Sequence, residues 1–100
     1  MRLTGFERKI LTEKTEKIFG KNAHLILFGS RVNENARGGD IDLLLIPEEI
    51  EDKDIFSHKI QFLVEVKNIL GDQKIDLIVQ RHGDNRGIIS TAKKNGIVLC

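Results

Sequence analysis

Cysteine and long apolar runs are both scarce in this sequence. Cys100 is the single cysteine, which excludes an intramolecular disulfide and a cysteine-rich zinc site. No stretch approaches the roughly 18 consecutive apolar residues of a transmembrane helix. Residues 1–14 also lack the apolar core of a signal peptide. We therefore expect a protein of a reducing compartment, the cytoplasm, without a membrane partner.

An excess of charge of one sign is also missing. The chain has 16 basic and 15 acidic residues, for a net charge of +1. Proteins that bind DNA usually carry a strong, clustered basic excess, so we expect no direct DNA binding. With 40% hydrophobic and 31% charged residues, the composition is typical of a soluble globular protein. A chain of 100 residues forms one modest core, which predicts a single domain over residues 1–100.

Helix and strand patterns alternate along the chain, and only one proline, Pro47, interrupts them. The predicted helices cover residues 4–20, 53–70 and 85–94. Thr4 and Glu7 have the spacing of a capping box at the start of the first helix, and Gly20 and Gly71 are placed to end the two long helices. The predicted strands cover 24–28, 40–46 and 74–80, residues 30–37 form a short helix or turn, and 97–100 form a final edge strand. The predicted buried positions are Phe6, Ile10 and Ile18 in the first helix, with Leu3, Leu11 and Phe19 nearby, Ile55, Phe56, Ile60, Leu63, Val66, Ile69 and Leu70 in the second, and Ile88, Ile89 and Ala92 in the last. The pattern predicts an α+β fold of two layers, with helices packed on a small mixed sheet of three to four strands.

Three aspartates stand at the starts of the second and third predicted strands. Side chains alternate along a strand, so Asp40 and Asp42 project from the same face. If the first two strands are antiparallel, the turn at Gly29 lies beside these aspartates. The helix over 53–70 then allows a parallel crossover that brings Asp76 to the same edge. We therefore predict that the three carboxylates converge.

Such a cluster of carboxylates needs a positive partner. Two residues along a strand span about 6.6 Å, which gives a repulsion of roughly 2.5 kcal/mol at an effective dielectric constant near 20. Magnesium ions are suitable partners, because one ion can take carboxylate oxygens and phosphate oxygens as ligands at the same time. A pair of such ions can also hold both the attacking and the leaving oxygen in phosphoryl transfer. Gly29 leaves room for a phosphate, Ser30 offers amide and hydroxyl donors, and Arg31 adds a charged fork. This combination suits nucleotidyl transfer from a nucleoside triphosphate.

Each signal also has a purely structural interpretation. An isolated pair of aspartates in a strand is a weak signal, and Lys74 could neutralise Asp76 from two residues away. Arg31 and Arg37 could be ordinary surface residues. The three histidines lack the spacing of a zinc site. The segment 29–39 has neither the GK[ST] ending of a P-loop nor the GxGxxG of a dinucleotide-binding fold.

Taken together, the motifs resemble a known family. Gly29-Ser30, the nine residues 31–39, Asp40-Ile41-Asp42 and the later Asp76 are similar to the DNA polymerase beta-like nucleotidyltransferase superfamily, in particular its minimal nucleotidyltransferases. The resemblance implies two magnesium ions and ATP as the donor of AMP. It also implies that Gly29, Ser30 and Arg31 bind the nucleotide, that Asp40, Asp42 and Asp76 bind metal, and that Asp76 helps to deprotonate the acceptor. One departure is Gly39, where the family often has a hydrogen-bonding residue.

The resemblance also implies a partner. Many minimal nucleotidyltransferases act as antitoxins of a helical HEPN toxin ribonuclease, in some cases by adenylylating a tyrosine of that toxin. The expected function is therefore transfer of AMP to a hydroxyl of a HEPN toxin. The alternatives are a non-catalytic binding module that neutralises the toxin by occlusion, and transfer to a small molecule with an acceptor site from another chain.

Overall fold

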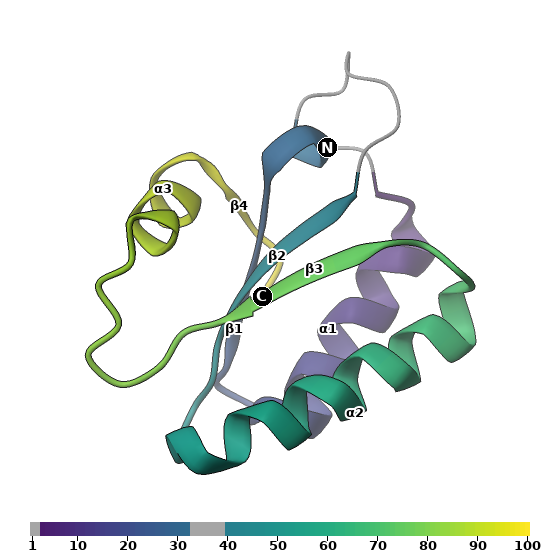
Figure 1. Cartoon of the computed structure of the whole chain (residues 1–100). Helices are drawn as coiled ribbons and strands as arrows, with labels where there is room; N and C mark the ends of the chain where they lie inside the picture. The colour runs from purple at the N-terminus through teal and green to yellow at the C-terminus, as the bar shows by residue number, and fades with distance from the viewer. Residues whose placement is uncertain (1–2, 33–39) are drawn as a thin grey trace.

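A four-stranded mixed sheet forms the centre of the molecule (Figure 1). The computed structural model describes residues 3–32 and 40–100, without the side chains of Ser30 and Arg31. The remainder of the predicted turn, residues 33–37, lies outside this range, as does Arg37. Among the described residues, no helix is both long enough and apolar enough to cross a membrane.

The strands are arranged in the order β3-β2-β1-β4. β1 (His24–Phe28) pairs antiparallel with β2 (Ile41–Ile46), and β2 pairs parallel with β3 (Ile75–Val79). β4 (Ile97–Val98) adds a short antiparallel strand beside β1. These pairings confirm the predicted antiparallel and parallel arrangement and the α+β fold class, because the hairpin reverses the chain and the crossover restores its direction.

Two long helices cover one face of the sheet. α1 (Gly5–Phe19) begins with the capping box that the sequence predicted: the Glu7 amide donates to the Thr4 hydroxyl, and the Thr4 amide donates to the Glu7 carboxylate. α2 (Asp52–Leu70) provides the crossover between β2 and β3. The main core lies between these helices and the sheet, and its fully buried members include Leu11, Phe19, Leu25, Leu27, Leu43, Leu45, Phe62 and Val66.

A third helix, α3 (Gly87–Asn95), lies on the opposite face of the sheet (Figure 1). A smaller apolar cluster holds it there, formed by Ile89 and Ala92 of α3 with Ile26 and Leu44. The sequence did not predict on which face α3 would pack. In the described part of the chain this short helix is the cover of that face, and the beginnings of β2 and β3, which carry the aspartates, extend beyond its apolar cluster.

The predicted apolar stripe of α2 is wrong in part. Ile55, Phe62 and Val66 are buried, whereas Phe56 is 71% exposed and Ile60 is 44% exposed. The buried residues stand seven and then four positions apart, which places them on one side of the helix. Other predicted core residues are also exposed on their helices, namely Ile69, Phe6 and Ile88. α2 contains more apolar residues than the sheet can cover, so composition alone did not reveal its buried side.

Candidate active site

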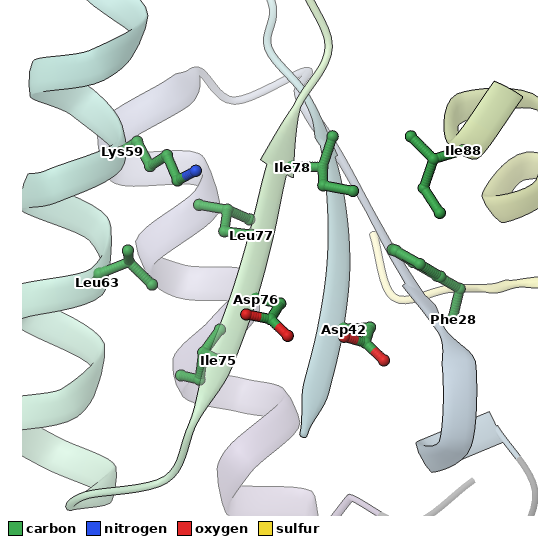
Figure 2. A pocket seen from close by; sticks show the side chains of 9 residues that line it. All are labelled: Phe28, Asp42, Lys59, Leu63, Ile75, Asp76, Leu77, Ile78 and Ile88. Atoms are coloured by element: carbon green, nitrogen blue, oxygen red, sulfur yellow. The ribbon is translucent and has the colours of Figure 1, made fainter. Parts of the chain in front are cut away.

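Two carboxylates stand directly opposite each other on the neighbouring parallel strands. Asp42 of β2 pairs in register with Asp76 of β3. Figure 2 shows both side chains projecting toward the same side of the sheet. Their face is the one that carries Leu44 and Ile78, which belong to the cluster under α3. The sequence correctly predicted that Asp42 and Asp76 would meet, because the positions of the two side chains follow from strand alternation and from the parallel crossover.

The pKa of Asp42 is raised above its ordinary value of 3.8. Burial is the largest cause, followed by repulsion from Asp76 and Asp40. A hydrogen bond between the Asp42 and Asp76 side chains acts in the same direction, since protonated Asp42 can donate to the other carboxylate. Lys74 lowers the pKa, but its effect is smaller. The negative charge at this position is therefore only partly neutralised by the described residues.

Asp40 lies two residues before Asp42, immediately ahead of β2, and has a different neighbour. Its Oδ2 lies 3.4 Å from the Lys74 ammonium, with side chains that are 37% and 73% exposed. The Ile41 amide donates to the Lys74 carbonyl at 3.0 Å, so the pair stands where the β2-β3 ladder begins. Lys74 therefore pairs with Asp40 and not with Asp76, the charge partner that the sequence had left open. Lys74 faces Asp40 because residues 40 and 74 each precede their strand by one position.

The predicted convergence of three carboxylates is confirmed only for two of them. Within residues 3–32 and 40–100, no three His, Cys, Asp or Glu side chains come close enough to hold a metal ion together. Asp42 and Asp76 are adjacent, whereas Asp40 is turned to Lys74. Carboxylate oxygens still fit magnesium, which often takes one or two of them together with phosphate and water. The metal-binding roles of the three aspartates stay predictions.

Gly29 is required by the approach of the turn to Asp42. The turn after β1 is a short 3-10 helix, Gly29–Val32, and Gly29 has a φ of +75° that favours glycine. A Cβ atom at this position would collide with the carboxylate of Asp42. The structure therefore brings the backbone of the predicted phosphate-binding turn against the predicted metal ligand. The side chains of Ser30 and Arg31 lie outside the described residues.

A cavity of about 670 Å³ opens beside the two aspartates (Figure 2). Besides Asp42 and Asp76, its lining comprises Phe28, Lys59, Leu63, Ile75, Leu77, Ile78 and Ile88. A second cavity of about 380 Å³ lies on the Gly29 side of Phe28, where Val32, Thr91 and Asn95 complete its lining. Lys59 was missed from the sequence, because only the packing of α2 beside β3 reveals which lysine of this helix reaches the cavity.

Comparison with known protein families identifies this arrangement. The family model described as "Polymerase beta, Nucleotidyltransferase" matches residues 13–100. The chain belongs to this nucleotidyltransferase family. A search among curated proteins found no matching relative. Family membership supports a transferase of nucleotidyl groups in general, and such domains generally use a nucleotide and a divalent metal.

Proposed function

We propose that this nucleotidyltransferase is a cytoplasmic, magnesium-dependent enzyme that moves AMP from ATP to a hydroxyl group. One observation carries the proposal: Asp42 and Asp76 face each other across paired strands, with the glycine turn packed against Asp42. Two adjacent carboxylates that the described residues neutralise only in part favour a bound cation over an apolar or neutral ligand. The family match supports the same reaction class.

In the proposed reaction, the acceptor oxygen forms a bond to the α-phosphorus of ATP while the bond between the α- and β-phosphates breaks, and pyrophosphate leaves. Asp42 and Asp76 would hold magnesium, with Asp40 as a third ligand; the bound ion would neutralise charge on the phosphates. Asp76 is exposed on the edge strand, where it can accept the proton of the attacking hydroxyl. Gly29 allows the phosphates to approach the carboxylates. Ser30 and Arg31 would contact them.

The proposed acceptor is a tyrosine hydroxyl of a HEPN toxin, for which this protein would act as the antitoxin. Support comes from the similarity of the motif to minimal nucleotidyltransferases. The cavity beside Asp76 adds further support. It is large enough for a side chain from another protein, and four consecutive residues of β3, the outermost of the described strands, line it. A protein acceptor could therefore reach the carboxylates from that side.

The test uses ATP labelled at the α-phosphate, magnesium and, as the acceptor, the HEPN toxin proposed as the partner. We expect label on the HEPN protein with the wild-type chain and with Asp72→Asn, a matched control in an exposed turn. We expect none with Asp42→Asn. If the HEPN protein acquires no label from ATP, or if Asp42→Asn leaves the labelling unchanged, the catalytic proposal is wrong.

A second candidate function is neutralisation of the toxin by occlusion. The observation that favours it is the engagement of Asp40 by Lys74, which leaves only two of the three aspartates together in the described structure. In that case Asp42→Asn would inhibit the ribonuclease activity of the partner as well as the wild-type chain does. A growth-rescue assay with the toxin therefore separates the two candidates.

A further inference from the structure

Four charged residues lie close together where β2 and β3 begin. Asp40 faces Lys74, and two residues further along the same strands Asp42 faces Asp76. Three negative charges and one positive charge give this group of residues a net charge of −2. An attractive pair therefore lies next to a repulsive pair, and among the described residues Lys74 is the cation that offsets the negative charge around Asp42.

Lys74 and a metal ion would compete for the same carboxylate. The ammonium lies 3.4 Å from Oδ2 of Asp40. Magnesium binds carboxylate oxygens at about 2.1 Å, so an ion on that oxygen would lie within about 5.5 Å of the ammonium. Two cations at this separation repel each other. Lys74 can leave, because 73% of its side chain is exposed and its stem is flexible.

We propose that Lys74 is the resident counter-ion of Asp40, which a divalent cation must displace before all three aspartates can act together. This inference rests on the proposed function, since it assumes that the aspartates bind metal. Lys74 is thus a positioning residue: it sets how readily Asp40 joins the site, without touching the nucleotide. It also explains why the three carboxylates do not form a cluster in the described structure.

The experiment measures binding of Mn²⁺ alone to the full chain by electron paramagnetic resonance of the free ion, with Mg²⁺ as competitor. Exposed ion pairs contribute about 0.4–1 kcal/mol, which corresponds to a two- to fivefold change in affinity. We therefore expect Lys74→Met to bind Mn²⁺ about two- to fivefold more tightly than the wild type. Lys53→Met is the matched control. It removes a similar exposed pair, with Glu51 at 3.3 Å, at the start of α2. We expect no change in its affinity for Mn²⁺.

The double variant tests displacement itself. In an Asp40→Asn background, Lys74→Met should no longer tighten binding, since there is no carboxylate to release. An equal gain in that background would overturn the inference, because Lys74 would then act only by repulsion at a distance. Unchanged or weaker binding by Lys74→Met would overturn it as well. If the wild type binds no Mn²⁺, or Asp42→Asn binds it equally well, the proposed function itself fails. Thermal melts in metal-free buffer verify that each variant is folded.

Discussion

Replacing Asp42 by asparagine is expected to stabilise the fold while it abolishes activity. The substitution keeps the size of the side chain and removes one of two like charges at directly paired positions. Cross-strand pairs contribute roughly 0.2–1 kcal/mol, and like charges are destabilising by similar amounts. Asp42 is half-buried, which places it toward the upper end of this range. A gain of 0.5–1 kcal/mol raises the Tm of a domain of this size by about 2–8 °C.

The pH dependence of the free energy of unfolding tests whether the charge of Asp42 destabilises the fold. The raised pKa of Asp42 means that the folded chain holds this proton more tightly than the unfolded chain does. The wild type therefore has the associated stability below the ordinary value of 3.8 and loses it as the pH rises through the raised pKa. The stability advantage of Asp42→Asn should be largest at pH 7 and should vanish near pH 3. Urea unfolding at both pH values measures it, with Asp72→Asn as the control.

Magnesium should reverse the order of stability. A ligand that binds only the folded chain stabilises it according to its concentration, so millimolar Mg²⁺ with ATP should raise the Tm of the wild type. It should leave the Tm of Asp42→Asn almost unchanged. The reasoning is refuted if Asp42→Asn is less stable than the wild type at pH 7, or if its advantage is the same at pH 3.

Three further substitutions test the turn, the core and an ion-pair network. Gly29→Ala should destabilise the fold by more than 1 kcal/mol and abolish ATP binding. Gly71→Ala, at a φ of +87° with no atom near the added Cβ, should lose only about 1 kcal/mol for the left-handed backbone; urea unfolding and nucleotide titration compare the two. Phe62→Ala should destabilise the fold by about 3–5 kcal/mol, whereas Phe56→Ala should change stability by less than about 0.5 kcal/mol in the same assay. Hydrogen bonds from lysines lower the pKa of Glu65 to about 2, so its carboxylate should stabilise the fold at pH 7 and lose that contribution as the pH falls from 4.5 toward 2. Glu65→Gln should abolish this pH dependence of stability in thermal melts.

Much of the fold and part of the site follow from local patterns in the sequence. The capping box at Thr4, the glycine after each long helix and the apolar strand runs predicted the elements to within about two residues. Strand alternation and the length of the crossover then predicted that Asp42 and Asp76 would meet. These predictions succeeded because each one depends on residues a few positions apart, or on a handedness rule with few exceptions.

The remaining features depend on contacts between distant segments. The sequence left Lys74 open as a charge partner of Asp76, because the two are close in sequence, whereas strand register places it opposite Asp40 across the ladder. Phe56 and Ile60 have the same apolar character as Ile55 and Phe62, so only the rotation of α2 on the sheet separates exposed from buried positions. The role of Lys59 in the cavity lining depends on the same rotation.

The outer edge of β3 has a consequence for how the chain behaves at high concentration. Among the described strands none pairs with this edge, and such rows of free amides and carbonyls recruit strands from other molecules. Charged groups stand along it: Lys74 precedes it, Asp76 projects from it, and the Arg86 guanidinium donates to the Val79 carbonyl at its end. Asp76, the proposed catalytic base, would thus also protect the edge against sheet-to-sheet aggregation. Neutralising it should therefore make the protein self-associate at lower concentrations.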